Sequence, residues 1–387
     1  MEHGSGALLA ILIVFVAAQL GSELAQRLKF PSVVGQIAAG MAVGPSALAW
    51  VKINEPLSVF AEIGAVLLLF AVGLETNLAD LRKVGKVALL VGVMGVILPF
   101  AAGAGWAMAA GFEVHKALFV AAAFVATSAG ITASVLQELG VLSRIESRII
   151  LGAAIIDDIL AMLILGVVTA LQTGTGVDFV QLLKVLAQAI GFVVVVAVVG
   201  RYIMRRSSKL MDAPMDSQSP LILSIAICLA LAVAAAYTGL AAIIGAFLAG
   251  MILSETQHRK DLQNDTKPIL AFIVPFFFVV TGMQVNLQLL GSWSVIGMVA
   301  LVTVLAILSK LIGAAIGAKS LGTKGAMIVG VGMVPRGEVG IIIASIGQHA
   351  KIFSDTIYAV IIAMSLLTSI FAPPILKAQF KKNAEAS

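Results

Sequence analysis

Apolar residues in this chain are gathered into long runs, and short polar segments separate one run from the next. A run of about 20 apolar residues is long enough to cross the hydrocarbon core of a bilayer as a helix. The pattern therefore predicts an all-α polytopic membrane protein with thirteen transmembrane helices. The predicted helices are 7–23, 32–45, 57–75, 87–109, 117–137, 148–171, 180–200, 220–237, 240–254, 268–283, 293–316, 325–348 and 356–376.

The composition excludes an ordinary soluble domain. Of the 387 residues, 60% are hydrophobic and 12% are charged, whereas soluble domains are about 25% charged. The single cysteine, Cys228, cannot form an internal disulfide or a cysteine cluster for zinc. The first apolar run follows Met1-Glu2-His3 and has no basic segment before it, so we expect it to be a retained span and not a cleaved signal peptide.

The formal net charge of +5 is explained by topology and does not indicate a nucleic-acid partner. Lys and Arg alternate in density between successive connecting segments, and the richer side is cytoplasmic by the positive-inside rule. We therefore expect an outside N-terminus and a cytoplasmic C-terminus, in a cell inner (plasma) membrane. The poorer side holds Lys52, Lys116, Lys184 and Lys351. The richer side holds Arg27, Lys29, Arg82, Lys83, Lys86, Arg144, Arg148, Arg201, Arg205, Arg206, Lys209, Arg259, Lys260, Lys267, Lys319, Lys324, Lys377, Lys381 and Lys382.

The chain resembles itself at an offset of about 210 residues. Three segments match in order: 33–41 with 243–251, 73–78 with 282–287, and 133–137 with 344–348. The offset equals seven predicted helices, and because seven is odd the two copies are expected to lie upside down to each other. The sequence thus predicts two inverted six-helix repeats joined by a linker helix, an arrangement common in secondary transporters.

Two corresponding helices carry signals of an interruption. In the fifth, Thr127 and Ser128 lie mid-span. In the twelfth, Pro335 removes a backbone donor, and Gly337 and Gly340 weaken the helix. We expect these discontinuous helices, 5 and 12, to cross near the midplane, where freed backbone groups can face an ion.

Five charged residues fall well inside predicted spans: Asp157, Asp158, Lys310, Arg336 and Glu338. Asp157 lies ten residues into its helix, about 15 Å deep in a core about 30 Å thick. Each unpaired charge there costs about 2.5–3.5 kcal/mol, so these groups must be paired, neutralised or hydrated. Three acids against two bases leave one negative charge, which a proton or a monovalent cation would neutralise.

The two aspartates are not expected to be equivalent. Neighbours on a helix point about 100° apart, so one is expected to pair with Lys310 while the other faces the ion path. Arg336 and Glu338 either shape the site or simply neutralise each other. Glu62 and Glu75 lie near span ends and have structural or gating roles. The four histidines fall in tails or loops, so no metal site other than the Na+ site at Asp158 and Asp157 is expected.

These motifs resemble the monovalent cation:proton antiporter-2 family, in its NapA/GerN-type sodium/proton branch with a Kef-like membrane domain. The resemblance covers essentially the whole chain. It rests on residues 31–36 through 44–45, 70–75, 155–160 and 332–340, and on Lys310. It implies a homodimer in which Asp158 is the main ion-binding carboxylate and Asp157 pairs with Lys310. Arg336, Glu338, Thr127 and Ser128 would shape the site.

The resemblance also implies a division into dimer and core ion-transport domains. The dimer domain would comprise 1–80 and 216–290, and the core domain 81–175 and 291–378. The linker helix would lie in 176–215 and a cytoplasmic tail in 379–387. Kef-type potassium systems usually carry Gln-Asp at the aspartate pair and append a cytoplasmic nucleotide-binding domain, which this chain is not expected to have.

The expected function is secondary active Na+ (or Li+)/H+ antiport by alternating access, with no cofactor and no enzymatic activity. The main alternative is a K+/H+ antiporter or Kef-type K+ efflux system, and a third reading is a Na+-coupled symporter of an organic solute. An intramembrane aspartyl protease ranks below these, because its two acids must face each other from separate helices.

Overall fold

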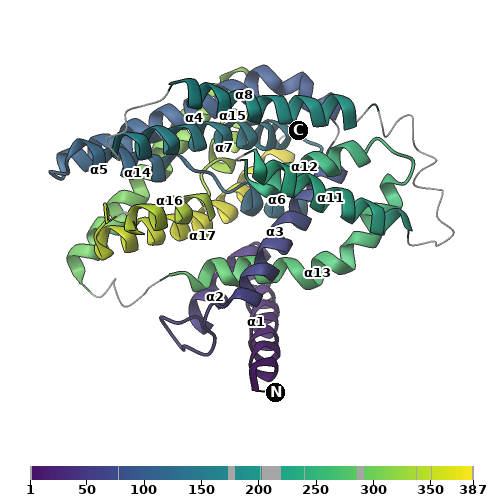
Figure 1. Cartoon of the computed structure of the whole chain (residues 1–387), viewed down its shortest axis with the longest axis horizontal. Helices are drawn as coiled ribbons and strands as arrows, with labels where there is room; N and C mark the ends of the chain where they lie inside the picture. Colours follow the sequence, from purple (N-terminus) through teal and green to yellow (C-terminus); the bar gives the residue numbers. More distant parts are fainter. Residues whose placement is uncertain are drawn as a thin grey trace.

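The computed structural model describes residues 2–76, 78–172, 179–200, 202, 219–238, 240–285, 292–336, 338–349 and 351–385. All regular secondary structure in these ranges is helical (Figure 1). The first half contains α1 (Glu2–Arg27), α2 (Ser32–Val43), α3 (Glu55–Glu75), α4 (Leu78–Ala109), α5 (Val114–Val125), α6 (Ala129–Glu138) and α7 (Ile145–Gln172). The second half contains α8 (Phe179–Val195), which continues into a π-helical turn (Val196–Gly200), α11 (Ser219–Tyr237), α12 (Ala242–Leu253), α13 (Arg259–Met283), α14 (Trp293–Gly317), α15 (Gly322–Gly332), α16 (Glu338–His349) and α17 (Asp355–Glu385).

Helix ends differ from the sequence prediction mainly where polar residues continue an apolar helix. Helix α4 begins at Leu78 and not at 87, α13 begins at Arg259 and not at 268, and α17 runs to Glu385 and not to 376. The boundary placed at 80/81 therefore falls inside α4, and the expected tail is helical through Glu385. Hydropathy detects the part of a helix that suits lipid, whereas backbone hydrogen bonding continues into the polar turns.

Eight helical stretches among the described residues are long and apolar enough to cross a membrane, and α5 with α6 counts as one of them. Helices α2 and α12 are shorter apolar helices, as is the Leu186–Val195 part of α8. This architecture is that of an integral membrane protein.

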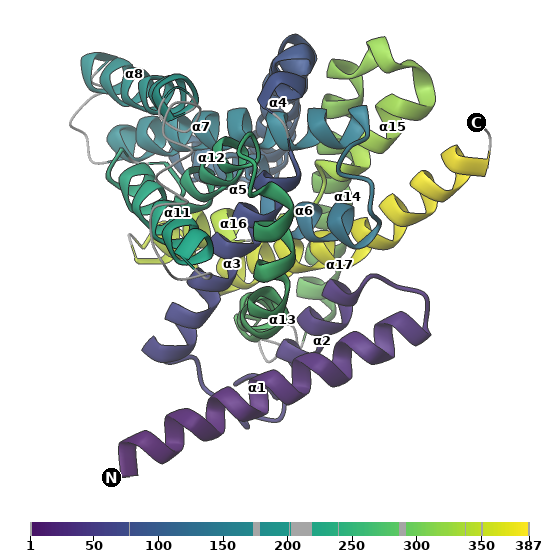
Figure 2. The same cartoon turned by 90° about the vertical axis from the view of Figure 1, so that its right-hand side faces the viewer.

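The helices pack mainly within two bundles. In the first bundle, α3 packs against α12 and α13, α1 against α2, and α11 against α12. In the second bundle, α4 packs against α5, α7 and α14, and α17 packs against α14, α15 and α16. Helix α1 lies along one edge of the molecule (Figure 2), with Leu8 70% and Leu20 67% exposed.

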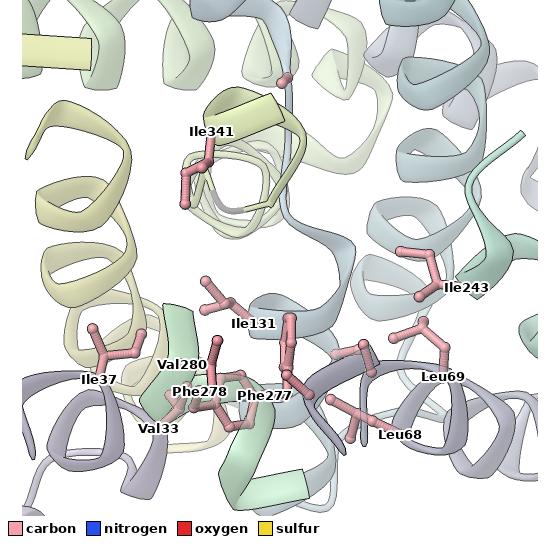
Figure 3. Packing of buried hydrophobic residues seen from close by; sticks show 14 of the residues in the cluster. Val33, Ile37, Leu68, Leu69, Ile131, Ile243, Phe277, Phe278, Val280 and Ile341 are labelled. Carbon is pink, nitrogen blue, oxygen red and sulfur yellow. The ribbon is translucent and has the colours of Figure 1, made fainter. Parts of the chain in front are cut away.

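The two bundles meet chiefly where α6 of the second bundle lies against α3 and α2 of the first. The contact is apolar: Figure 3 shows Ile131 of α6 facing Phe277, Phe278 and Val280 of α13. Ile131 and Phe278 are almost completely buried. Helix α6 is short because it is one half of an interrupted span. The candidate site lies at this interruption.

Candidate functional site

The first interruption separates α5 from α6. Helix α5 ends at Val125, and Ala126 turns to an extended conformation with ψ 135°. Ser128 is the N-cap of α6 and accepts a hydrogen bond from the backbone N–H of Ile131 at 3.5 Å. Serine is a favoured N-cap because its hydroxyl satisfies an N–H that has no partner within the helix. The polar pair Thr127-Ser128 therefore marks the start of a new helix.

The second interruption separates α15 from α16. Helix α15 ends at Gly332, residues 334–336 have no regular secondary structure, and α16 begins at Glu338. Pro335 has no N–H for a helical hydrogen bond, which accounts for the break at this place.

The two interruptions lie directly against each other. The backbone N–H of Ser128 donates to Pro335 O at 2.8 Å. The Thr132 hydroxyl donates to Gly332 O at 2.8 Å, and the Thr127 hydroxyl to Met333 O at 3.4 Å. Backbone groups that an interrupted helix leaves unpaired are thus satisfied by the opposite interruption, as a buried position requires.

A buried ion pair lies beside this crossing. Lys310 of α14 donates from Nζ to Asp157 Oδ1 of α7 at 2.6 Å, and both side chains are 0% exposed. The same ammonium donates to Val125 O, the last carbonyl of α5, at 2.7 Å. Lys310 therefore binds one carboxylate and the negative end of a helix. Helix α14 also packs closely against α4 at Gly317. A Cβ atom added at Gly317 would lie 2.6 Å from the backbone of Val91, so only glycine fits there.

Arg336 is a second fully buried cation at the same helix end. Its Nε and one terminal nitrogen donate to Phe124 O at 3.0 and 2.6 Å. Further donors reach Ala306 O at 3.1 Å and Val334 O at 3.2 Å. The fixed fork of the guanidinium suits several carbonyls at once. The last two carbonyls of α5 thus hold both cations, of which Lys310 is also paired with Asp157.

Asp158 occupies a different position from its neighbour. It is 4% exposed and lines a cavity of about 20 Å³ together with Leu69, Ile243 and Phe247 of the first bundle. Ala129, the first residue of α6, lines the same cavity. A helix N-terminus is the positive end of the backbone dipole and favours an adjacent carboxylate. The cavity has room for about one water-sized species.

The structure thus brings Asp157, Lys310, Arg336, Thr127 and Ser128 to one crossing, with Asp158 in the cavity beside it. Glu338 begins α16, but its side chain lies outside the described residues.

Sequence reasoning missed the residues that hold the Arg336 backbone. Thr368 Oγ1 accepts from Arg336 N at 3.2 Å, and the Ser369 hydroxyl donates to Arg336 O. Both residues, with Ser365, are fully buried on α17. Hydroxyls at positions i, i+3 and i+4 of an otherwise apolar span share one helix face, and this pattern was a signal for them.

The sequence matches the family described as sodium/hydrogen exchanger, transmembrane, over residues 10–382. The chain belongs to the sodium/hydrogen exchanger family. This membership agrees with the resemblance noted in the sequence.

Several proteins that match nearly the full length of this chain are named as Na+/H+ antiporters. The chain is 34% identical to the high-affinity Na+/H+ antiporter NhaS3 of Synechocystis sp., covering 97% of this chain and 90% of that protein. It is 33% identical to a Na+/H+ antiporter of Enterococcus hirae, covering 96% and 97% of the two chains. It is also 33% identical to the Na+/H+-K+ antiporter GerN of Bacillus cereus, covering 96% and 95%.

Among solved structures, the fold is similar to that of the sodium proton antiporter MjNhaP1 from Methanocaldococcus jannaschii. The TM-score is 0.69 at 19% sequence identity, and the match covers 98% of both chains.

Proposed function

We propose that this chain is a secondary active antiporter that exchanges Na+ or Li+ for H+, and that Asp158 binds the transported cation. The observation that carries the proposal is the unequal aspartate pair. Asp157 is held by Lys310 at 2.6 Å, whereas Asp158 lines a cavity that the two bundles share. A carboxylate in such a place can be neutralised by a proton or by a small cation, and competition between the two couples their transport.

Lys310 and Asp157 have a supporting role in this proposal. While the ion pair is closed, the two buried charges neutralise each other, and a cation arriving at Asp158 changes the charge balance of the crossing. Thr127, Ser128, Arg336 and Glu338 shape the site, because the broken helices on which they lie position the backbone around the aspartates.

The size of the cavity supports an ion over an organic solute. Pockets for small organic molecules are typically about 300–1,000 Å³, and the space beside Asp158 is about 20 Å³. Its remaining lining is apolar, with Leu151, Ala154 and Ile155 on α7.

The finer architecture is part of the same proposal. Thirteen helices span the membrane, with helices 1–6 and 8–13 as inverted repeats and helix 7 as linker. The first bundle forms the dimer domain of a homodimer and the second the mobile core domain. The N-terminus is outside, the C-terminus is cytoplasmic, and the membrane is the inner (plasma) membrane. The apolar surface between Ile131 and Phe277, Phe278 and Val280 supports movement of one bundle against the other, because apolar side chains form no directional bonds.

The experiment is cation-dependent proton flux in proteoliposomes, with Asp158→Asn as the decisive variant. We expect the asparagine variant to lose exchange, because it cannot release a proton. Asp261→Asn is the matched control, since Asp261 is an exposed carboxylate in the first turn of α13. Robust Na+-dependent proton flux in Asp158→Asn would refute the assignment.

K+/H+ exchange is the second candidate, since the relative GerN is named a Na+/H+-K+ antiporter. Currents on a solid-supported membrane with Na+, Li+ and K+ over a range of pH separate the two. A K+ current at least as large as the Na+ current would favour the second candidate.

A further inference from the structure

A hydrogen bond joins the two bundles at one end of the molecule, away from the aspartate pair. Gln137, near the C-terminal end of α6, donates from Nε2 to Glu75 Oε1 at the C-terminal end of α3, at 3.0 Å. Both residues lie on the side that the charge pattern assigns to the cytoplasm. The pair therefore fixes the core bundle against the first bundle on the inner side.

The neighbouring residue makes a second contact between the bundles. Glu138 Oε2 accepts from Ser32 N at 2.9 Å and from Ser32 Oγ at 2.6 Å. The carboxylate lies at the N-terminus of α2, the favourable end of the helix dipole. Helix α2 has no side-chain cap of its own at Pro31, so the core bundle supplies this cap.

Glu75 is itself fixed within the first bundle. Arg259 of α13 donates to Leu74 O at 3.1 Å and to Glu75 O at 3.0 Å. Gln263 donates to Leu74 O at 3.0 Å. Residues of the first bundle thus bind the last backbone carbonyls of α3. The Glu75 side chain takes no part in these bonds and contacts Gln137 of α6 instead.

The internal repeat gives this pair a counterpart at the opposite end. Residues 73–78 match 282–287 and residues 133–137 match 344–348, so Glu75 corresponds to Gln284 and Gln137 to Gln348. Gln284 ends α13 and Gln348 lies in the last turn of α16, both on the side assigned to the exterior. Two glutamine side chains can form the same hydrogen bond that joins Gln137 to Glu75.

In this structure the counterpart pair is not formed. Within the described part of the chain, the buried Oε1 of Gln284 has no hydrogen-bond partner. Gln284 lines a cavity of about 340 Å³ together with Glu62 and Thr281. Gln348 instead donates to Asp355 Oδ1 at 3.0 Å. A buried acceptor without a hydrogen-bond partner is costly, so a donor that reaches Gln284 in another state would stabilise that state.

We propose that Glu75–Gln137 and Gln284–Gln348 are alternating latches, which hold the core bundle against the first bundle on the inner and the outer side in turn. In this structure the inner latch is closed and the outer latch is open. This inference rests on the proposed function, because it assigns the two latches to the two end states of alternating access.

The chemistry of the two latches is unequal. The inner latch uses a carboxylate, whose hydrogen bonds are roughly twice as strong as those between neutral groups, and Glu138 adds a second contact. The outer latch joins two neutral amides. The state with the inner latch closed is therefore the resting state, and the state with the outer latch closed is a minor population.

Cross-linking reports how often the helix ends that carry each latch approach each other. In a Cys228→Ala background, which removes the single cysteine, the pair Glu75→Cys/Gln137→Cys is expected to cross-link rapidly with a short bismaleimide. The pair Gln284→Cys/Gln348→Cys is expected to cross-link slowly. Adding Gln137→Ala to the outer pair is expected to speed its cross-linking about tenfold, because losing a hydrogen bond to a charged group shifts a two-state equilibrium by about that factor or more.

Two variants keep the result interpretable. Glu75→Gln, which preserves an amide partner, is expected to speed the outer cross-link less than Gln137→Ala. Gln26→Ala is the matched control, because Gln26 bonds only locally to Ser22 on α1, and it is expected to leave the rate unchanged. An outer cross-linking rate that is the same with and without Gln137→Ala would overturn the proposal. The proposed function is tested separately, by measuring Na+-dependent proton flux in the Cys228→Ala protein. If that flux is absent, the proposed function fails, while the cross-linking comparison still decides whether the latches exist.

Discussion

Replacing Lys310 by methionine is expected to destabilise the protein more than any exposed lysine substitution. Methionine keeps an unbranched side chain, shorter by one atom, and removes the charge. The change leaves the Asp157 carboxylate and the Val125 carbonyl, bonded at 2.6 and 2.7 Å in the native protein, without their donor. Both lysine and aspartate are 0% exposed, so water cannot take over the lost bonds.

The magnitude follows from the burial of the pair. Removing one partner of a buried ion pair costs about 3–5 kcal/mol, because the remaining charge is left uncompensated. With an unfolding entropy of about 2.1 cal/mol/K per residue, this loss corresponds to a decrease of about 4–6 °C in the unfolding midpoint of a chain of this length. The decrease is expected to shrink in acid, since a protonated, neutral Asp157 needs no cation.

The assay is thermal unfolding of the purified protein in detergent, followed by the loss of monodisperse protein on size-exclusion chromatography. A double-mutant cycle uses Lys310→Met, Asp157→Asn and the combined variant, and Lys324→Met is the control because Lys324 is exposed. The combined variant holds no uncompensated charge and is expected to recover most of the lost stability, so the two effects are not additive. Two additive losses, or a loss in Lys310→Met no larger than in Lys324→Met, would refute the reasoning.

Two further substitutions test the crossing. Arg336→Lys is expected to lower the free energy of unfolding by about 2–3 kcal/mol, because an ammonium cannot reach Phe124 O, Ala306 O and Val334 O together. The same melting assay measures this loss. A loss of stability smaller than that of Lys324→Met would contradict the prediction. Ser128→Ala removes the N-cap of α6 and is expected to cost about 1 kcal/mol. Ser128→Asn, which can still cap the helix, should retain most of that stability in the melting assay, and equal losses in the two variants would argue against a capping role.

Much of this protein is determined by its sequence alone. The apolar runs predict where the helices lie but not their polar ends, because a span must hide its backbone hydrogen bonds and present apolar side chains to lipid. Thr127-Ser128 and Pro335 mark the interruptions, since a capping hydroxyl and a missing N–H act through local geometry. Five charges in apolar runs predict a candidate site, because an isolated charge in lipid is too costly to be incidental, and the structure brings Asp157, Lys310 and Arg336 together.

Only the tertiary structure decided which groups these residues contact. Helical spacing predicts that one aspartate pairs with Lys310, but which one does so depends on how α7 packs, and Asp157 forms that bond, as the family resemblance implied. Arg336 binds carbonyls that become available only because α5 ends beside it. The bond between Gln137 and Glu75 joins residues 62 positions apart on two bundles. Contacts of this kind depend on the relative placement of packed helices, which hydropathy and local propensity do not encode.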